Sequence, residues 1–527
     1  MSSGTGQIPN GWGITSLERV CEILDSIRIP INAKERNDRI ANNKPSELYP
    51  YYGATGKVGT IDGYLFEGEH LLLGEDGAPF LDHTKDTAYL ASGKFWVNNH
   101  AHILKAYISN KYLCHYLNQF DFTKSVTGTT RLKLNQASLK EIPVWFAPEN
   151  EQHRIVAKIE ELFSELDKGI ESLKTVREQL KVYRQALLKH AFEGKLTEQW
   201  RQDNADKLET ADQLLERIKQ EREARYQQQL EEWEAAVKQW EADGKEGKKP
   251  RRPASFKELP PLAETELDAL PALPETWTYH RLAEISQIGS GMSVSKSRKL
   301  GKPVEVPYLR VANVQRGGLV LDEVKTMLIE EEKLKDHLLE KWDVLFNEGG
   351  DRDKLGRGWV WESQIGQCIT QNHVFRATTY LGGEVHSKFV SHWGNTHGQD
   401  YFDKGGKQTT NLASINKTVL SMFPVPMPPV EEQEQIITLL EEKMSTLDSF
   451  ESDIDKSLRM SESLRQSILK KAFSGQLVPQ DPSDEPASVL LERIAKEKEE
   501  AAARAKKAKA AKKKPKTTKT ARRKARS

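Results

Sequence analysis

One phrase occurs twice in the chain, and this internal repeat constrains the fold more than any other feature of the sequence. Residues 187–197 read LLKHAFEGKLT and residues 468–478 read ILKKAFSGQLV, at a spacing of 281 positions. The same spacing continues backwards without a gap, so that PENEQHRIVAKIEELFSELD at 148–167 aligns with PVEEQEQIITLLEEKMSTLD at 429–448. A repeat of this length indicates that one structural unit is built twice.

The segments between these copies correspond more weakly. Four pairs of short motifs recur in the same order: GWGITSLERV with TWTYHRLAEI, LLLGEDG with VLFNEGG, NNH with QNH, and GTT with QTT. The two helical segments align without a gap, whereas the two globular segments have diverged until only these short motifs remain similar. The whole chain is therefore a globular segment followed by a long helix, built twice.

The ungapped copies predict two long helices. Residues 149–192 contain no proline, and their apolar residues recur in alternating steps of three and four, as in a coiled-coil seam. A proline precedes each helix and Gly194 or Gly475 follows it, as expected for start and stop signals. Because a globular segment separates the helices, we expect an antiparallel pair. The predicted seam consists of Ile159, Leu162, Leu166, Leu173, Val176, Leu180, Tyr183 and Leu187, with Leu440, Leu447, Phe450, Ile454, Leu464 and Ile468.

The predicted fold class is α/β (α+β), with two globular domains that alternate with two long α-helices in an internal pseudo-twofold repeat. The globular segments are rich in glycine, aromatic residues and short β-like runs, and residues 109–120 predict a short helix. Residues 211–240 predict a polar amphipathic helix, and 248–277 an extended proline-rich linker. The predicted boundaries are 8–147 and 274–427 for the globular domains, 148–197 and 428–478 for the helices, 198–273 for the insert, 479–503 for a C-terminal helix and 504–527 for a disordered basic tail.

Charge is distributed unevenly along the chain. The formal net charge is +1, yet residues 504–527 carry 13 Lys and Arg and no acid. Such a block is typical of a disordered tail, which either adds sequence-independent attraction to phosphate or only increases solubility. No apolar run approaches the ~18 residues of a membrane span, the N-terminus lacks the features of a signal peptide, and the three cysteines are scattered. We expect a cytoplasmic protein without membrane contact.

No motif for catalysis or metal binding emerges from the sequence. The segment GATGKVG at 53–59 lacks the spacing of a phosphate-binding loop, and GSGMS at 289–293 lacks the rest of a dinucleotide fingerprint. His386, His392 and His397 lie near one another but without HExxH spacing or cysteine partners. We therefore predict no catalytic residue and no metal ligand, and we interpret 53–59 as a β-turn and the histidines as core or surface residues.

The globular segments instead offer polar side chains of the kinds that read base edges. Arg and Lys suit guanine O6 and N7, whereas Asn and Gln suit adenine N6 and N7. For each loop by itself, a solvated turn is the alternative interpretation. The repeated pairs Asn99-His100 and Asn372-His373 fit this role or that of strand-end structural residues equally well. The candidate DNA-binding residues are Tyr52, Lys57, Thr129, Thr130, Arg131, Lys133, Arg310, Asn313, Arg352, Lys354, Arg357, Lys407, Gln408, Thr409 and Asn411.

Several motifs occur together in this chain: the segment starts IPNGW…LERV and LPETW…LAEI, the stretch YYGATGKVGTIDGYLFEGEHLLLGEDG at 51–77, the helix openings PENEQ and PVEEQEQ, and the AFxGxL helix ends. In this combination the chain resembles the specificity subunit of type I restriction-modification enzymes. The resemblance covers about residues 8–495, and the insert at 200–275 and the lysine-rich tail depart from it.

The resemblance implies that each globular segment is a target-recognition domain for one half of a bipartite site in double-stranded DNA, with the helices as spacers. It also implies two methyltransferase subunits docked on the helices and restriction (motor-nuclease) subunits joined through them. S-adenosylmethionine, ATP and Mg²⁺ would belong to those partners, with no cofactor in this chain. The alternative is a coiled-coil interaction scaffold without sequence-specific DNA binding. The residues expected to form the partner-binding helix surface are Gln152, Ile155, Phe192, Gln433, Ile436 and Phe473.

Overall fold

The computed structural model describes residues 8–82, 84–293, 300–408 and 413–512, except for the side chains of 408 and 505–512. The chain divides into two compact units. Each unit combines one globular domain with one part of each long helix, so the predicted alternation of globular segments and helices is confirmed. Among the described residues, no helix is long and apolar enough to cross a membrane. Unit 1 consists of Met1–Thr175 and Asp453–Ser527, and unit 2 of Val176–Ser452.

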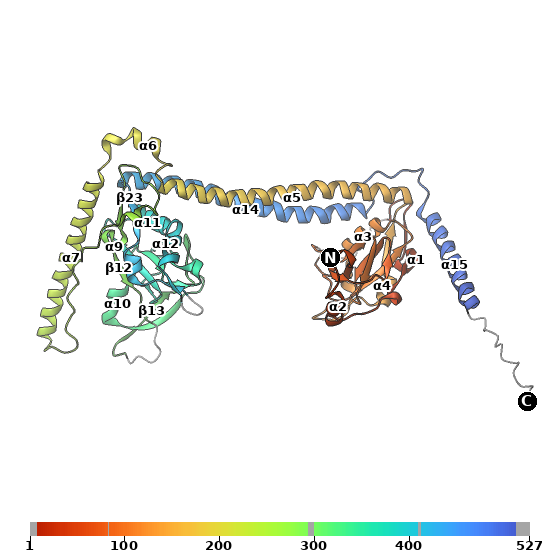
Figure 1. Cartoon of the computed structure of the whole chain (residues 1–527), viewed down its shortest axis with the longest axis horizontal. Coiled ribbons are helices and arrows are strands. Elements are labelled where there is room, and N and C mark those ends of the chain that lie inside the picture. Colours follow the sequence, from red (N-terminus) through yellow and green to blue (C-terminus); the bar gives the residue numbers. More distant parts are fainter. Residues whose placement is uncertain (1–7, 83, 294–299, 409–412, 513–527) are drawn as a thin grey trace, which may run out of the picture. The chain divides into compact units, whose positions relative to one another are not determined.

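The two long helices are α5, Glu149–Phe192, and α14, Val430–Ala472. They lie alongside each other in opposite directions within each unit (Figure 1). In unit 2 the end of α5 packs with the start of α14, and in unit 1 the start of α5 packs with the end of α14. The predicted antiparallel pairing is therefore confirmed within each unit.

The predicted seam of this pair is only partly buried. Its ends lie in the cores of the two units, but four members nearer the middle of the helices are about half exposed. The prediction of one continuous buried seam is wrong for these four, because a pair of helices covers one stripe of each partner and side chains outside that stripe need another neighbour. The exposed members are Val176 (42%), Tyr183 (51%), Phe450 (53%) and Leu464 (51%).

The globular domain of unit 1 contains two four-stranded sheets, with the orders β2-β9-β6-β7 and β4-β3-β8-β5, and the pair β1-β10. Its helices α1, α3 and α4 pack in one core with the first sheet, and α3 confirms the short helix predicted at 109–120. The elements are β1 Gly13–Ser16, α1 Leu17–Val20, β2 Cys21–Ile23, α2 Ala33–Ile40, β3 Tyr49–Gly53, β4 Gly56–Ile61, β5 Phe66–Glu67, β6 His70–Gly74, β7 Ala88–Ala91, β8 Lys94–Val97, β9 Ala101–Ala106, α3 Asn110–Gln119, α4 Gln136–Glu141 and β10 Pro143–Phe146.

The globular domain of unit 2 contains the sheets β12-β20-β17, β16-β13-β19 and β18-β22-β21, with the pairs β11-β23 and β14-β15. Its largest helix, α11, carries several buried residues of the unit 2 core. The elements are β11 Thr278–Arg281, α9 Leu282–Ile285, β12 Ser286–Ser290, β13 Pro303–Leu309, β14 Val314–Gln315, β15 Gly318–Leu319, β16 Lys325–Glu330, α10 Glu331–His337, β17 Val344–Asn347, β18 Gly349–Gly350, β19 Ile369–Thr370, β20 Val374–Thr379, α11 Glu384–Thr396, α12 Gly398–Gly405, β21 Lys407–Gln408, β22 Ala413–Ser414, α13 Lys417–Ser421 and β23 Pro424–Met427.

The two domains share one framework although their sequences have diverged. The antiparallel pair β1-β10 aligns Ser16 with Pro143, and β11-β23 aligns Arg281 with Pro424 in the equivalent register. In the first sheet of each domain, β9 lies between β2 and β6 as β20 lies between β12 and β17. The second sheet contains one parallel pair in each case, β3-β8 or β13-β19. The short motifs that the two globular domains share therefore indicate a duplicated fold.

The repeated phrase ends each long helix against the start of a globular domain. Gly194 and Gly475 follow the helices with φ of +68° and +71°, a region that glycine adopts without strain. A Cβ atom at Gly194 would collide with the ring of Pro274, and a Cβ atom at Gly475 with the ring of Pro9. Pro9 and Pro274 are equivalent residues at the starts of the two domains. The phrase therefore occurs twice because each helix end meets the same kind of domain start.

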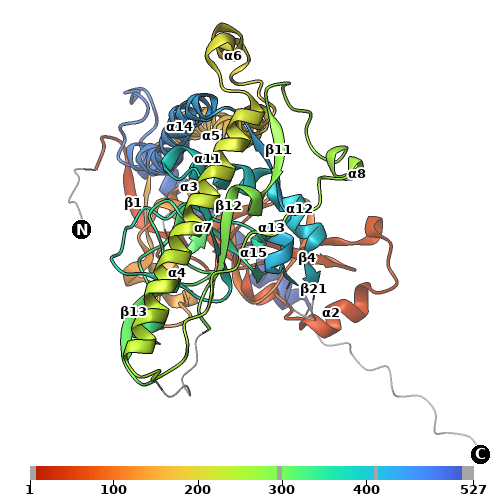
Figure 2. The ribbon, with the colours of Figure 1, turned by 90° about the vertical axis from the view of Figure 1, so that its left-hand side faces the viewer.

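The insert is built around α7, Ala211–Ala242, so its predicted helix is confirmed. Leu214 and Ile218 in the first turns of α7 are buried in the core of unit 2, and Figure 2 shows the helix passing in front of β12. The proline-rich segment that follows returns along α7, where Trp233 Nε1 donates a hydrogen bond to the carbonyl oxygen of Pro250 at 3.1 Å. Two short helices complete the insert: α6, Glu198–Asp203, and α8, Glu264–Leu267.

The C-terminal helix α15, Ala487–Lys512, packs on unit 1 through its LLERI motif at 490–494, as α7 packs on unit 2 through an identical motif. The helix predicted at 479–503 is therefore wrong at both ends. The disorder predicted from residue 504 is wrong up to residue 512, because the alanine-rich sequence there favours continued helix. Residues 513–527 of the predicted tail lie outside the described residues.

Candidate nucleic-acid interface

Three loops of the unit 1 domain meet at one edge of its first sheet. Because β6 and β9 are antiparallel neighbours, the loop after β6 lies beside the loop before β9. The amide of Glu75 donates a hydrogen bond to the carbonyl oxygen of His100 at 2.8 Å, and the amide of Leu134 donates one to the carbonyl oxygen of Glu75 at 2.7 Å. These bonds join the loops into one surface. We name it the three-loop platform of unit 1 and define it as residues 75–77, 98–100 and 127–134.

The unit 2 domain builds the equivalent surface with the same backbone contacts. The amide of Glu348 donates to the carbonyl oxygen of His373 at 2.9 Å, and the amide of Ile415 donates to the carbonyl oxygen of Glu348 at 2.8 Å. Asn416 then caps α13 as Asn135 caps α4 in unit 1. The platform is therefore a repeated feature of the framework. The three-loop platform of unit 2 consists of residues 348–350, 371–373, 407–408 and 413–415.

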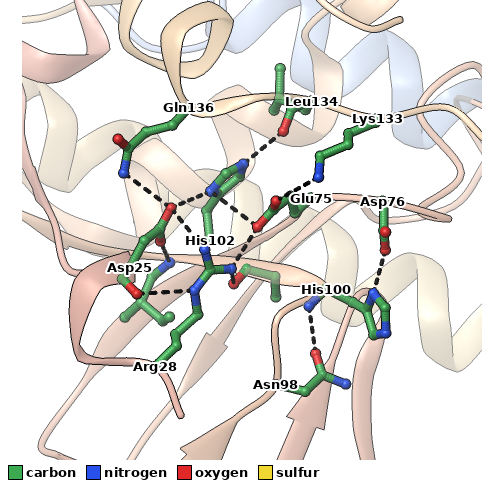
Figure 3. A network of polar contacts seen from close by, with 12 residues as sticks. Asp25, Arg28, Glu75, Asp76, Asn98, His100, His102, Lys133, Leu134 and Gln136 are labelled. Carbon is green, nitrogen blue, oxygen red and sulfur yellow. Dashed lines mark hydrogen bonds and ion pairs between the residues drawn. The ribbon is translucent and has the colours of Figure 1, made fainter. Parts of the chain in front are cut away.

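One arginine joins two carboxylates next to the platform of unit 1 (Figure 3). Arg28 Nη1 lies 2.6 Å from Glu75 Oε2, and its Nη2 lies 3.4 Å from Asp25 Oδ2. The buried ring of His102 contacts Asp25 through Nδ1 at 2.6 Å and the carbonyl oxygen of Leu134 through Nε2 at 2.8 Å. Burial by itself would raise the pKa of Asp25, but the hydrogen bond and charge of His102 and the charge of Arg28 hold that pKa below its usual value.

The carboxylates and imidazole of this network lie within 4.8 Å of one another, a spacing that also suits a metal ion. The guanidinium of Arg28, however, already occupies the position between the carboxylates, and both ring nitrogens of His102 are engaged. The network therefore acts as an internal anchor that ties the platform loops to the sheet. Sequence reasoning missed it because its members are scattered along the chain from Asp25 to His102.

Candidate residues on the platform of unit 1 are exposed and held by acids. Arg131 Nη2 lies 3.0 Å from Asp76 Oδ1, and Lys133 Nζ lies 3.2 Å from Glu75 Oε1. Their side chains remain 61% and 51% exposed, so both cations are available to a ligand. The structure therefore brings together the candidates from this loop: Thr129, Thr130, Arg131 and Lys133.

The two remaining candidates of the first half lie on the hairpin β3-β4, whose turn at 54–55 confirms a turn within the predicted 53–59, whereas 56–59 belong to β4. Tyr52 packs its ring against Tyr89 and Phe95, at centroid distances of 5.9 and 5.6 Å. This aromatic packing makes Tyr52 a framework residue and argues against its prediction as a base reader. Lys57 is exposed on β4 and remains a candidate DNA-binding residue.

In unit 2 the candidates after β18 lie next to the platform. Arg352 Nε lies 3.1 Å from Asp403 Oδ1 and its side chain is 55% exposed, whereas Lys354 forms an ion pair with Asp351. Arg357 is half-buried. Two further candidates, Lys407 and Gln408, form β21, and the side chain of Lys407 is exposed, whereas Thr409 and Asn411 lie outside the described residues.

Asn313 and Arg310 serve a turn of the domain rather than an open surface. Asn313 is 3% exposed and donates hydrogen bonds to the carbonyl oxygens of Val320 at 2.9 Å and Glu323 at 3.0 Å. Its Oδ1 accepts from the amide of Arg310 at 3.0 Å. Asn313 has no group left for a base, so its prediction as a DNA reader is corrected. The Arg310 side chain also contacts Glu323, through the carbonyl oxygen at 3.2 Å.

Arg316 is a cation near this surface that the sequence interpretation missed. Its guanidinium donates hydrogen bonds to the carbonyl oxygens of Asn395 and Asp353, the latter at 3.2 Å. Burial lowers the pKa of Arg316, and the charge of the neighbouring Arg357 lowers it further. The sequence feature that could have identified it is the position of Arg316 directly before two glycines, Gly317 and Gly318. Arg316 ties the loop around Asp353 to the end of α11 and thereby supports Arg352 and Arg357.

The residues predicted to bind partner subunits are all buried within this chain. Gln152 and Gln433 donate equivalent hydrogen bonds to the carbonyl oxygens of Ala147 and Pro428, both at 2.8 Å. The other four residues belong to the two large cores. Their prediction as a partner surface is wrong, because repetition here reflects contacts with the two domains of the chain itself. The buried residues are Gln152, Ile155, Phe192, Gln433, Ile436 and Phe473.

Known proteins are similar to this chain in sequence and in fold. The specificity subunit of the type I restriction enzyme EcoDI from Escherichia coli is 22% identical over 509 residues, which cover 94% of this chain and 96% of that relative. The putative type I restriction enzyme specificity subunit S.HindORF215P from Haemophilus influenzae is 35% identical over 148 residues, 28% of this chain and 36% of the relative.

A solved structure supports the fold. A chain from a structural study of complex assembly and conformational transition of the type I R-M system matches with a TM-score of 0.54 at 15% identity, covering 89% of this chain and 100% of that one. The family model described as the type I restriction modification DNA specificity domain matches residues 9–180 and 274–458, more than half of the chain. The chain therefore belongs to the type I restriction-modification DNA specificity family, and its role is that of a specificity subunit.

Proposed function

We propose that the chain reads a bipartite site in double-stranded DNA, with the three-loop platform of each unit facing one half of the site. One observation carries this proposal: both domains build the same loops on the same backbone hydrogen bonds but place different side chains there. The platform of unit 1 presents Arg131 and Lys133, whereas unit 2 presents Lys407 on its platform and Arg352 and Lys354 next to it. A shared framework with variable side chains suits two readers of different half-sites.

The charged side chains on and next to the platforms suit different tasks on DNA. Arg131 is held by Asp76 and Arg352 by Asp403, so each guanidinium has a defined orientation while remaining exposed. A positioned guanidinium binds guanine O6 and N7 in a bidentate manner. Lys133 is a point charge that suits a phosphate and adds affinity without sequence information.

We also propose that two methyltransferase subunits dock on α5 and α14 and that restriction subunits join through them. S-adenosylmethionine, ATP and Mg²⁺ then belong to those partners. The half-exposed apolar side chains of the helices support this docking, because they offer apolar surface that a partner can bury. Tyr183 and Leu464 occupy equivalent positions of the two repeats at a spacing of 281, so one docking site is expected per repeat.

The test of DNA reading uses the chain purified together with its methyltransferase subunits and a randomised duplex library. Arg131→Ala is expected to relax the preference at one half-site, and Arg352→Ala at the other, each with a loss of about 10-fold or more for the preferred base. Lys181→Ala, an exposed lysine on α5, is the matched control and is expected to leave recognition unchanged. Equal binding of all duplexes by the wild-type complex would overturn the proposal.

The test of docking places a charge in the apolar surface. Tyr183→Asp and Leu464→Asp are each expected to remove one methyltransferase subunit from the complex, as measured by mass photometry. Lys181→Asp changes a neighbouring polar position and is expected to retain both subunits. Membership of the specificity family disfavours the alternative of a scaffold without sequence-specific DNA binding. A complex that assembles fully with both charged variants would contradict the docking surface.

A further inference from the structure

The dipeptide Asn-His lies at the same place on both platforms, as Asn99-His100 before β9 and Asn372-His373 before β20. The structure assigns neither histidine to the core. The side chain of His100 is 35% exposed and that of His373 is 53% exposed. Their carbonyl oxygens serve the framework by accepting the equivalent hydrogen bonds from Glu75 and Glu348. The framework therefore explains the backbone at these positions but not the choice of an imidazole side chain.

Each imidazole is held by a carboxylate through its Nδ1 atom. His100 Nδ1 lies 2.5 Å from Asp76 Oδ1, as Figure 3 shows, and His373 Nδ1 lies 3.0 Å from Glu348 Oε2. The two carboxylates do not occupy equivalent positions of the repeat. Glu348 is equivalent to Glu75, whereas the carboxylate that holds His100 belongs to Asp76, one residue after Glu75. In unit 1, Glu75 is already engaged by a lysine and an arginine of the anchor. The histidine–carboxylate pair thus persists although the residue that supplies the carboxylate has changed.

The pairing fixes what the other ring nitrogen can do. With Nδ1 donating to the carboxylate, the protonated ring still has a hydrogen on Nε2 for an anionic acceptor. The carboxylate stabilises the positive charge of the ring, and DNA offers phosphate oxygens as acceptors. A side chain that is identical in two domains with different reading loops suits the part of DNA that is identical everywhere, its phosphate backbone.

We propose that His100 and His373 each bind one DNA phosphate through Nε2 in the imidazolium form, with Asp76 and Glu348 as positioning residues. This inference rests on the proposed function, since it assumes that the platforms face DNA. The histidines set the position of each domain on the duplex, and the neighbouring variable cations read the bases. The two roles separate because phosphate contacts add affinity equally for every sequence, whereas base contacts do not.

The charged groups around the two rings differ. His100 faces Asp76 and also the guanidinium of Arg131, whose Nη2 lies 3.4 Å from its Nδ1. His373 faces Glu348, and the amide nitrogen of the Asn372 side chain lies 3.5 Å from its Nε2. The two imidazoles therefore keep the same kind of carboxylate contact in different charged surroundings.

The experiment measures DNA affinity of the complex with methyltransferase subunits as a function of salt and pH. His100→Gln and His373→Gln are expected to weaken binding about 3- to 10-fold at pH 6 for cognate and scrambled duplexes alike, and to make the slope of log affinity against log salt shallower by about 1 each. The measurement is repeated at pH 8, and the loss at each pH is compared with that of the control variants. Asp76→Asn and Glu348→Gln keep the ring but weaken its charge, so their losses at pH 6 are expected to be smaller.

The matched controls are His153→Gln and His190→Gln, which change exposed histidines on α5 in unit 1 and unit 2. They are expected to leave affinity, salt slope and pH dependence unchanged. Platform histidine variants that behave like these controls, or that change base preference without a uniform loss, would overturn the inference. If Arg131→Ala and Arg352→Ala weaken or relax binding in the same assay, the proposed function stands and only the phosphate contact fails. If they also have no effect, the proposed function fails as well.

Discussion

Arg184 on α5 and Asp448 on α14 form an ion pair at 2.6 Å in unit 2, and the same pair recurs in unit 1 with the helices exchanged. The residues 281 positions away from them are Arg465 and Asp167, and these also form an ion pair. One register of helix pairing is therefore used twice, with the arginine on α5 in one unit and on α14 in the other.

The twin ion pairs are expected to act independently and to contribute little each. The arginine side chains are about one-third exposed and the aspartates about two-thirds. Exposed pairs of this kind typically contribute about 0.2–1 kcal/mol to the free energy of unfolding. Asp448→Arg is expected to destabilise unit 2 by like charge, and the exchange Arg184→Asp with Asp448→Arg to restore stability. A double-mutant cycle in urea that gives no coupling energy would contradict the pairing.

Replacement of two equivalent buried glutamates, Glu432 and Glu151, by glutamine is expected to change the free energy of unfolding in opposite directions. Glu432 is fully buried and accepts hydrogen bonds from Thr197 at 2.7 Å, Arg201 at 2.9 Å and Trp277 at 2.8 Å. Glu432→Gln is expected to lower the free energy of unfolding by about 3–5 kcal/mol, because it leaves the guanidinium of Arg201, only 15% exposed, without its charged partner. Its equivalent Glu151 is 1% exposed, and its Oε1 has no hydrogen-bond partner among the described residues.

Burial raises the pKa of Glu151 above its ordinary value of 4.5. The ionised form is therefore disfavoured in the folded chain, and this cost is present above that ordinary value and absent well below it. Glu151→Gln is expected to stabilise the chain at pH 7 by up to about 1 kcal/mol and to have no effect near pH 3. Urea unfolding at both pH values checks the prediction, and a destabilised variant at pH 7 would be the opposite result.

Three glycines, one inside a long helix and two just after the helix ends, are expected to change the free energy of unfolding differently when replaced by alanine. Gly194→Ala and Gly475→Ala force a Cβ atom into positive φ and against a proline ring, so each is expected to cost about 1–2 kcal/mol or more. Gly169 lies inside α5 with no atom within 4 Å of its Cβ position, so Gly169→Ala is expected to stabilise the helix by about 1 kcal/mol. Thermal unfolding of the three variants measures the contrast. Equal effects at all three positions would refute it.

The Asp25–His102 contact is expected to stabilise the anchor of the unit 1 platform in a pH-dependent way. Because the pKa of Asp25 lies below its ordinary value of 3.8, the stability that it contributes is present above that value and is lost as pH falls through the folded-state pKa. Asp25→Asn is expected to cost about 3–5 kcal/mol at pH 7, and the difference from wild type is expected to narrow in acid. Asp38→Asn, on the exposed face of α2, is the control. A constant difference across the acid range would contradict the assignment.

The repeat made the architecture predictable, because an ungapped spacing of 281 residues left only one way to align the two helices. It did not reveal what the repeated residues contact. Gln152 and Phe192 would recur in the sequence whether they bound a partner twice or the two domains of their own chain. Only the packing distinguishes these cases, since both residues are buried inside this chain. The exposed seam positions could not be predicted either, because a stripe of apolar residues carries no record of what covers it.

The sequence predicted which loops form the candidate site, but not which of their side chains are exposed there. Asn313 and Arg131 both look like polar loop residues in the sequence, yet one is enclosed by carbonyl groups of its own loop and the other is exposed. The direction of a loop side chain depends on how the backbone of the loop folds, which the residue type does not specify. The anchor made by Arg28 was invisible because its members are scattered along the chain.

The division into units also sets an order for synthesis. Unit 2 is one continuous stretch, so all its residues have left the ribosome before those of unit 1 are complete. The N-terminal domain must wait for Phe473, whose ring packs edge-on against Tyr112 and Tyr116 at 5.2 and 5.3 Å. Until then its aromatic face remains uncovered, a state prone to aggregation. The nascent chain is therefore expected to complete the fold of unit 2 first. The N-terminal domain, although it is synthesised first, is expected to complete its fold last.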